Sequence, residues 1–172
     1  MRQLLLILLA TRSLNSQGVC QLSESGVTLV KHYEQFRARP YTDGGRGSRL
    51  AIGYGYTHGV KPWERWTEET ADAVLRHDLQ VRANKLCKEL GPHSLTRHQL
   101  SALVSLSYNM GVPGVIKSTL FQNLKRGQLT PDLFRWYVNA KGKPSKGLKR
   151  RREAEIRLWH TPPNKPMKKE HL

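Results

Sequence analysis

Two carboxylates, Glu34 and Asp43, have the chemistry and the spacing of an acid pair. Eight residues separate them, and a run rich in glycine and aromatic side chains (44–57) follows. Cleavage of a glycosidic bond requires such a pair, because a carboxylic acid must protonate the leaving oxygen while a carboxylate activates water or stabilises positive charge. Pairs at this interval are also frequent by chance. On chemistry alone we therefore favour the simpler interpretation, a surface carboxylate on a helix and a turn-forming aspartate.

The segment around the pair has the pattern of a helix that runs into a small sheet. Ser23 and Ser25 are candidate N-caps for a helix through 27–36, in which apolar side chains recur on one face. That periodicity places Glu34 at the inner edge of the helix, near its C-terminal end. The following stretch, 38–57, mixes glycine and turn residues with β-formers, which predicts short strands joined by tight turns.

From Trp66 onward the pattern becomes helical. Thr67 is a candidate N-cap, and Thr96 with Gln99 forms a capping-box pattern. The predicted helical segments are 66–86, 100–110, 120–127, 132–140 and 150–159. We therefore expect an α+β, mainly helical chain, with a small N-terminal antiparallel sheet lobe, a larger helical lobe and a site in the cleft between them.

The chain is strongly basic, with 29 Lys and Arg against 13 Asp and Glu and a net charge of +16. Such a charge indicates an anionic partner: nucleic acid, a membrane surface or an acidic polymer such as a bacterial wall. We do not expect nucleic acid, because no aromatic residues are interleaved with the basic run 141–152 and no recognised nucleic-acid motif occurs. A non-catalytic wall-binding or membrane-active protein is a further alternative, suggested by the amphipathic segment 150–159.

The cysteines and histidines do not form a metal motif. Cys20 and Cys87 lie too far apart in the sequence for a CxxC pair or a zinc knuckle, and we favour two reduced thiols over a disulfide. The seven histidines are scattered, without HExxH or any paired metal spacing. We therefore expect no metal and no cofactor.

Four stretches of the chain resemble the phage-type lysozymes, endolysins that cleave the glycan strand of peptidoglycan. They are YEQFRARPYTD with IGYGYT, WTEETADAVLRHDL, LTRHQLSALVSLSYNMGVPGVIKSTL and FRWYVNAKGKPSKGLKRRREAEIRLW. Their order and spacing match the family, and together they span about 22–160. The resemblance implies a lysozyme-like fold with the active site between the two lobes. It also implies hydrolysis of the bond between N-acetylmuramic acid and N-acetylglucosamine.

The same resemblance implies roles for individual residues. The family's general acid falls on Glu34 and its second carboxylate on Asp43, at the family's own interval. Tyr41, Asn109 and Met110 fall where the family lines its sugar-binding groove, although core packing is an equal alternative for Met110. A general acid must carry its proton, which burial between the lobes favours, so a fully exposed Glu34 would count against this assignment.

One arginine of the GLKRRREAE motif pairs with the catalytic glutamate in this family. In this chain it is either Arg150 or Arg151, and the sequence leaves both open. A solvated basic face is the alternative for both residues.

The chain departs from the family at Ala51. The family usually has a threonine directly before the Ile-Gly-x-Gly run, and its hydroxyl holds the attacking water together with the aspartate. Here alanine replaces it, and Ser48, Thr57 or Asp43 alone must hold the water. The alternative is a lytic transglycosylase, in which a hydroxyl of the sugar closes the ring. We favour hydrolysis because Asp43 is retained.

We divide the chain into an N-terminal extension or export signal (1–21), a lysozyme-like catalytic domain (22–160) and a disordered basic tail (161–172). The first 18 residues resemble a minimal export signal cleaved after Gly18, and an additional packed helix or strand is the alternative. The expected partners are peptidoglycan glycan strands and an anionic wall or outer-membrane surface. We expect a monomer that acts in the periplasm or cell wall of a bacterial host, after export or holin-type release, during phage-mediated lysis.

Overall fold

In a computed structural model of the chain, the described residues are 20–42, 49–92, 95–140 and 142–167. The candidate export signal 1–18 lies outside them, as do Asp43 and Ser48. The elements in chain order are α1 (Glu24–Glu34), β1 (Arg37–Thr42), β2 (Leu50–Gly53), α2 (Glu68–Leu90), α3 (Arg97–Met110), α4 (Val112–Lys117), α5 (Thr119–Lys125), the 3-10 helix η1 (Pro131–Trp136), β3 (Asn139–Ala140), β4 (Lys143–Pro144) and α6 (Lys146–Trp159). The predicted α+β, mainly helical architecture is confirmed.

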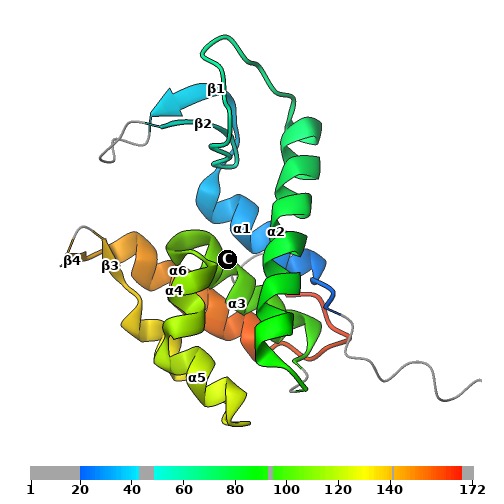
Figure 1. Cartoon of the computed structure of the whole chain (residues 1–172), viewed down its shortest axis with the longest axis vertical. Helices are drawn as coiled ribbons and strands as arrows, with labels where there is room; N and C mark the ends of the chain where they lie inside the picture. Colours follow the sequence, from blue (N-terminus) through cyan, green and yellow to red (C-terminus); the bar gives the residue numbers. More distant parts are fainter. Residues whose placement is uncertain (1–19, 43–48, 93–94, 141, 168–172) are drawn as a thin grey trace, which may run out of the picture.

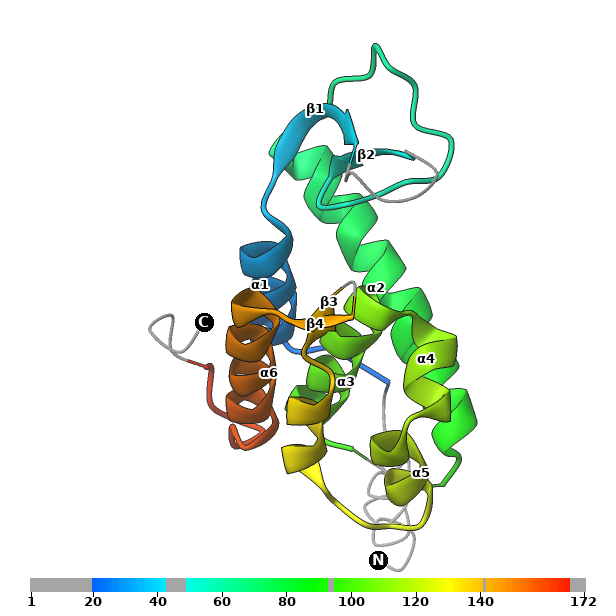
Figure 2. The same ribbon diagram turned by 90° about the vertical axis from the view of Figure 1, so that its left-hand side faces the viewer.

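The elements form two lobes connected by one long helix. Figure 1 shows α2 running from the sheet lobe, built on β1 and β2, down the side of the helical lobe. Figure 2 shows α1 and α6 side by side beneath the sheet, and these two helices contact each other. Helix α3 lies at the centre of the helical lobe, where all residues from Leu100 to Ser107 are buried. The core therefore lies below the sheet, and the ends of α1 and α3 reach the junction between the lobes.

Helix α1 begins and ends where local chemistry requires. Ser23 is the N-cap, and its Oγ accepts the Gly26 N–H at 3.1 Å. The helix ends at Glu34 because Gln35 adopts a positive φ of 56° while its N–H still bonds the Lys31 carbonyl at 3.0 Å. The chain then turns directly into β1, so Glu34 lies at the helix end, as predicted.

The sheet lobe is held by an antiparallel pair of short strands. Strands β1 and β2 pair with Tyr41 opposite Ala51, and an isolated bridge joins Ile52 to Tyr56 just beyond β2. The loop that follows returns to the sheet, where the Trp66 N–H donates to the Ala38 carbonyl at 3.0 Å. These bonds bring the IGYG turn back over the end of α1.

The predicted helix over 132–140 is only partly confirmed. The first residues form η1, and the last two form β3, which pairs with β4 across a turn at Gly142 with a φ of 77°. A short 3-10 helix fits here because it requires only a few residues and begins at Pro131, where a missing N–H costs nothing. Helix α4 was not predicted, because Gly111, Pro113 and Gly114 suggested a break in the chain; each of the other helices begins and ends within four residues of its predicted position.

The prediction of two reduced thiols is wrong. Cys20 and Cys87 form a disulfide with their Cα atoms 6.3 Å apart, which joins the segment before α1 to the last turns of α2. The Gln80 side chain also donates to the Cys20 carbonyl at 2.6 Å and holds this segment against α2. Sequence spacing could not show the pairing, because 67 positions separate the two residues and only the folded chain brings them together.

The end of the described chain returns to α1. The Met167 N–H donates to Ser25 Oγ at 2.9 Å, and the Met167 side chain packs against the hydrophobic core. Residues 161–167 of the expected tail thus contact the domain, and 168–172 lie outside the described residues. Across the described ranges, no helix is both long and apolar enough to span a bilayer.

Candidate active site

Glu34 lies at the junction of the lobes with 24% of its side chain exposed. Its Oε1 accepts a hydrogen bond from Arg151 Nη1 at 2.5 Å. The Arg151 side chain is only 5% exposed, whereas Arg150 is exposed at the surface of α6. The structure therefore pairs Glu34 with Arg151 and not with Arg150. The acid is neither free in solvent nor fully enclosed.

Three helices hold Arg151 in place. Its backbone belongs to α6, its Nη2 donates to the Ser105 carbonyl of α3 at 3.1 Å, and its guanidinium lies 5.6 Å from the ring centroid of Tyr33 on α1. A guanidinium over an aromatic face is an attractive cation–π arrangement. The position of the Arg151 charge is consequently set by contacts on several sides rather than by its pairing with Glu34 alone.

The turn after β2 passes close to the second oxygen of Glu34. Gly55 has a φ of 94°, and a Cβ built on it would lie 3.9 Å from Glu34 Oε2 and 3.9 Å from Tyr108 Oη. A positive φ favours glycine, and the missing side chain leaves the space beside the carboxylate open. The IGYG run thus has a local reason for its second glycine next to the acid.

A hydrogen bond across the lobes holds that turn. The Tyr108 hydroxyl on α3 donates to the Tyr54 carbonyl at 2.7 Å, and the Arg82 guanidinium lies 4.8 Å from the centroid of the Tyr108 ring. Burial raises the pKa of Tyr108, and the nearby Glu34 carboxylate raises it further. The phenol therefore keeps its proton and remains a donor throughout the neutral range.

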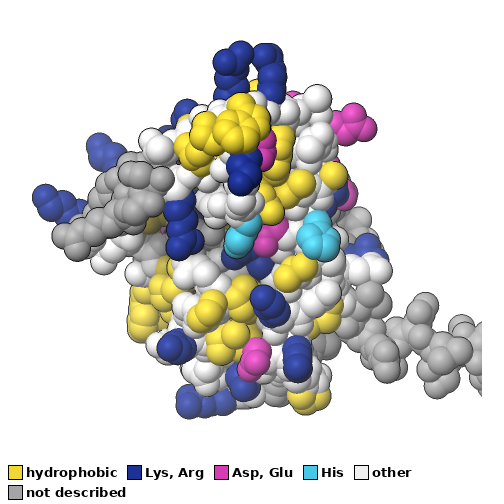
Figure 3. Space-filling model, turned by 45° about the horizontal axis from the view of Figure 1, so that its top comes forward, with side chains coloured by type: hydrophobic (Ala, Val, Ile, Leu, Met, Phe, Trp, Pro, Cys, Tyr) yellow, Lys and Arg dark blue, Asp and Glu magenta, His cyan; other side chains and the backbone are white. Residues whose placement is uncertain are grey.

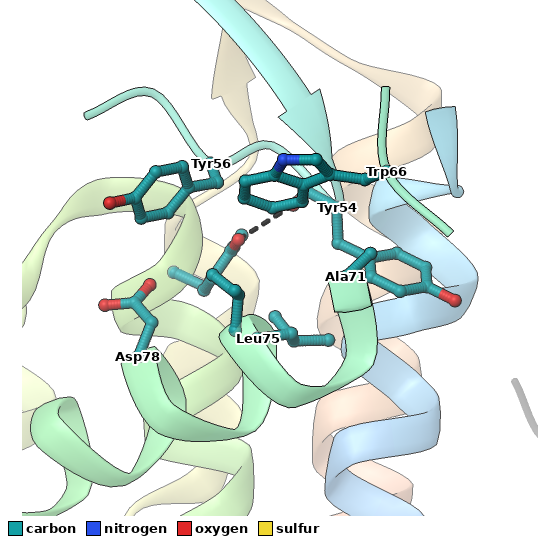
Figure 4. A pocket seen from close by; sticks show the side chains of 8 residues that line it. Tyr54, Tyr56, Trp66, Ala71, Leu75 and Asp78 are labelled. Carbon is teal, nitrogen blue, oxygen red and sulfur yellow. Dashed lines mark hydrogen bonds between the residues drawn. The ribbon is translucent and has the colours of Figure 1, made fainter. Parts of the chain in front are cut away.

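Aromatic packing closes the junction around this bond. Figure 4 shows Tyr54, Tyr56, Trp66, Ala71, Leu75 and Asp78 around a small hollow, with the bond to the Tyr54 carbonyl as a dashed line. The Tyr56 and Trp66 rings lie 5.4 Å apart between centroids. The hollow has a volume of about 10 Å³, which is space for one water at most. It is therefore a packing feature and not a ligand site.

The predicted groove residues lie in two places. Tyr41 is on β1, with the Arg37 guanidinium 4.6 Å from its ring centroid. Asn109 and Met110 end α3 and line a hollow of about 430 Å³ in the helical lobe. Met110 also packs against the core, as the alternative interpretation of this residue expected.

Sequence reasoning missed Trp136 as a lining residue of this hollow. Its side chain is 64% exposed and belongs to η1, and Tyr137, Asn139 and Leu148 complete the lining. The adjacent aromatic pair Trp136-Tyr137, directly before the β3–β4 turn, was the available signal. An exposed aromatic side chain beside polar groups is typical of a sugar-binding surface, because its flat face is apolar while the rim stays wet.

Ala51 is buried and supplies no hydroxyl group. Its side chain is 3% exposed and its backbone pairs with Tyr41 in the sheet. Thr57, half-buried, follows the Ile52–Tyr56 bridge. The other candidates for holding water, Ser48 and Asp43, lie outside the described residues.

Basic side chains are scattered over the surface of the molecule. Figure 3 shows Lys and Arg spread over the face that includes the sheet lobe, with few acidic side chains among them. Several of the acidic residues are already paired, for example Glu24 and Asp72 with Arg76. The surface is thus suited to an anionic partner.

Comparison with known proteins agrees with this geometry. The family model described as phage lysozyme matches residues 31–155. The endolysin of Acyrthosiphon pisum secondary endosymbiont phage 1 is 34% identical over 146 residues, which cover 81% of this chain and 98% of that protein. The SAR-endolysin of Escherichia phage Mu is 31% identical over 146 residues, with 83% of each chain covered. The endolysin of Bacillus phage B103 is 34% identical over 152 residues and is longer, since the match covers 87% of this chain but 57% of that protein.

Solved structures agree at the level of the fold. The muramidase domain of SpmX from Asticaccaulis excentricus superposes with a TM-score of 0.74 at 30% identity, over 83% of this chain and 99% of that domain. A P22 lysozyme variant superposes with a TM-score of 0.71 at 27% identity, over 82% and 99% of the two chains. From the family match and the relative that aligns over nearly its whole length, this chain belongs to the phage lysozyme family of glycoside hydrolases.

Proposed function

We propose that this lysozyme cleaves the bond between N-acetylmuramic acid and N-acetylglucosamine in peptidoglycan, with Glu34 as general acid and Asp43 as the carboxylate on the water side. The observation that carries the proposal is the position of Glu34 at the lobe junction. Its Oε1 accepts a hydrogen bond from Arg151 at 2.5 Å, and its Oε2 lies on the side of Gly55, which has no side chain there. With one oxygen fixed by the arginine, the other oxygen is the one suited to deliver a proton.

The proposed reaction begins with transfer of a proton from Glu34 Oε2 to the glycosidic oxygen. The C–O bond breaks as the proton arrives, and positive charge develops on the sugar ring. Asp43 accepts a proton from the attacking water, which forms the new bond to the anomeric carbon. Asp43 then releases its proton to solvent, Glu34 regains one from solvent, and the two products leave.

Arg151 has an orienting role in this scheme. Its positive charge favours the ionised form of an adjacent carboxyl group, whereas burial favours the protonated form. Its Nη1 donates to Glu34 Oε1 and its Nη2 donates to the Ser105 carbonyl, so the arginine fixes the direction of the carboxyl group.

Ala51 favours a second candidate function. Its buried methyl group cannot hold a water molecule, so Asp43 must act alone or with Ser48 or Thr57. A lytic transglycosylase needs no such water, because the muramic acid hydroxyl closes the ring. Mass spectrometry of the released fragments separates the two functions: hydrolysis leaves a reducing end, and transglycosylation leaves an anhydro end lighter by one water.

The test of the catalytic assignment is clearing of a peptidoglycan suspension. Glu34→Gln and Asp43→Asn should each lose about 10²-fold or more of the rate, since each removes a proton-transfer group. Glu24→Gln is the matched control, because Glu24 lies in the first turn of the same helix and is 77% exposed. Clearing by Glu34→Gln at the rate of the control would contradict the proposal.

We place this activity in the periplasm or cell wall of the host, where the enzyme acts as a monomer and its basic surface contacts anionic wall or outer-membrane groups. The Cys20–Cys87 disulfide supports an exported enzyme, because disulfides persist mainly in oxidising compartments. A relative named as a SAR-endolysin supports it as well. Sequencing of the mature N-terminus tests the export signal: a first residue after Gly18 is expected, and a start at Met1 would exclude that cleavage.

A further inference from the structure

A second ion pair lies behind Arg151, without any access to solvent. The side chains of Arg152 and Glu155 are both 0% exposed, and Arg152 Nε lies 2.9 Å from Glu155 Oε2. Arg151 Nε lies 3.4 Å from Glu155 Oε1. A buried ion pair is weak support for stability, because well-packed apolar residues of similar size often serve a core equally well or better. These charges therefore call for a role beyond packing.

Contacts connect the buried pair to the catalytic acid on one side and to the groove on the other. The Ser105 hydroxyl donates to Glu155 Oε1 at 2.6 Å, and the Ser105 carbonyl accepts from Arg151 at 3.1 Å. Arg152 Nη2 donates to the Asn109 side-chain oxygen at 3.4 Å, at the end of α3. Glu155 thus holds the inner side of Arg151, whose outer side contacts Glu34.

We propose that Glu155 is a positioning residue for catalysis: it balances the charges of Arg151 and Arg152, holds Arg151 against Glu34 and sets the upper end of the pH range in which the enzyme works. This inference rests on the proposed role of Glu34 as general acid. Glu155 itself touches no substrate, since its side chain is fully buried behind Arg151.

The charge balance follows from the groups that face this cluster. Helix α1 contributes Glu34 and the phenol of Tyr33, α3 contributes the neutral groups of Ser105 and Asn109, and α6 contributes Arg151, Arg152 and Glu155. The remaining cations of α6 near Tyr33, Arg150 and Arg157, are exposed. When Glu34 is ionised, the two arginines and two glutamates carry no net charge; when Glu34 carries the proton that catalysis requires, Glu155 limits the excess to one positive charge.

Removal of the Glu155 charge leaves one uncompensated positive charge beside Glu34. A positive charge stabilises the ionised form of a carboxyl group, so the acid form that catalysis requires is lost at lower pH. In Glu155→Gln, the alkaline limb of the activity profile should therefore move to lower pH by about one unit, the size expected for one charge at this range in a protein interior. At the wild-type optimum kcat should fall several-fold, while KM changes little because substrate contacts remain.

A charge-balanced double variant separates electrostatics from packing. Arg152→Gln combined with Glu155→Gln again leaves one arginine opposite one glutamate. The alkaline limb should return toward its wild-type pH, although two buried side chains have changed. If the cluster served packing alone, the double variant would show no such recovery.

Glu153→Gln is the matched control for the loss of one negative charge. Glu153 lies on the same helix two positions earlier, pairs with Arg135 and is 44% exposed. Its substitution should leave the pH profile unchanged, because the charge is screened by solvent. A shift equal to that of Glu155→Gln would mean that total charge governs the profile, and would overturn the inference.

Thermal unfolding of every variant accompanies the kinetics. If Glu155→Gln does not fold, the double variant serves as the test, and a folded double variant whose activity is lost at the same alkaline pH as wild type supports the inference. A folded Glu155→Gln enzyme with an unchanged pH profile overturns the inference. Failure of both variants to fold overturns it as well, because the cluster would then serve stability alone. The Glu34→Gln result distinguishes the two proposals. If Glu34→Gln keeps full activity, Glu34 is not the general acid. If Glu34→Gln is inactive but the pH profile of Glu155→Gln is unshifted, only the proposed role of Glu155 is refuted.

Discussion

The hydrogen bond between the Tyr108 hydroxyl and the Tyr54 carbonyl joins the helical lobe to the turn that passes beside Glu34. Tyr108→Phe removes this bond and keeps the ring, including its contact with Arg82. Tyr54 is 4% exposed, so its carbonyl loses its partner in a nearly dry site. We expect lower stability and a looser position of Gly55 beside Glu34.

The size of the stability loss depends on whether the Tyr54 carbonyl finds another hydrogen-bond donor. A buried polar group left without a partner costs about 1–3 kcal/mol. The neighbouring hollow of about 10 Å³, enlarged by the missing hydroxyl, has space for one water that would bond the carbonyl in part. We therefore expect Tyr108→Phe to lower the free energy of unfolding by about 1–2 kcal/mol, in the lower part of that range. For a chain of this length the loss corresponds to a Tm lower by roughly 3–6 °C.

Calorimetry over a range of pH measures this effect. The pKa of Tyr108 is raised by burial, so the folded state favours the protonated phenol relative to the unfolded chain, whose tyrosines titrate near 10. The contribution of Tyr108 is therefore fully present below about pH 10 and declines as the pH rises above that value. The difference in Tm between wild type and Tyr108→Phe should be constant from neutral pH up to about 9 and should shrink at higher pH.

Tyr56→Phe is the matched control for this substitution. It removes a hydroxyl from the same junction, and the structure gives that hydroxyl no protein partner within the described ranges. Its Tm should stay within about 1 °C of wild type, as for surface substitutions. Equal Tm values for Tyr108→Phe and Tyr56→Phe, with equal rates of clearing, would refute the proposed connection between the lobes.

Two further predictions concern the helical lobe. Replacement of Cys20 and Cys87 by serine should lower the free energy of unfolding by about 2–4 kcal/mol, because the disulfide closes a loop across 67 positions. Activity at 25 °C should be retained. A wild-type Tm that does not change when a reductant is added would contradict this prediction. Trp136→Ala should raise KM several-fold with a smaller effect on kcat, because the groove loses an aromatic face. Trp63→Ala, which removes an 80% exposed tryptophan that does not line this hollow, is the control, and an equal rise in KM for both would exclude a specific role for Trp136.

The sequence predicted the enzyme class and the architecture because both depend on order and local pattern. Four family blocks in the correct order indicated a phage-type lysozyme, and family membership confirms the enzyme hypothesis over a non-catalytic basic protein. The capping box at Thr96 and Gln99 is present with both of its hydrogen bonds, at 3.2 and 2.9 Å. Such bonds join residues three positions apart, so the sequence contains all the information that they need.

The arginine that pairs with Glu34 could be identified only in the folded chain. Neighbouring positions on a helix differ by about 100° in direction, so in a run of three arginines each side chain points to a different side. Helix α6 turns Arg151 and Arg152 toward α3 and leaves Arg150 at the surface. The sequence could not show which face α6 buries, because the apolar stripe of this helix is interrupted by charged residues that are themselves buried.

The same distinction applies to the whole site. Glu34 at the end of a capped helix, followed at once by a strand, results from interactions within about a dozen neighbouring residues, and these can be recognised in the sequence. The Arg151 contact with Glu34 spans 117 positions, the disulfide spans 67, and the hollow at Trp136 combines residues of α3, η1, β3 and α6. Contacts of this kind form only when whole faces of helices pack together, and a buried charge is stable only where that packing brings its partner. The position of Glu34 at a helix end could therefore be predicted from the sequence, whereas the residues that surround it could be identified only in the fold.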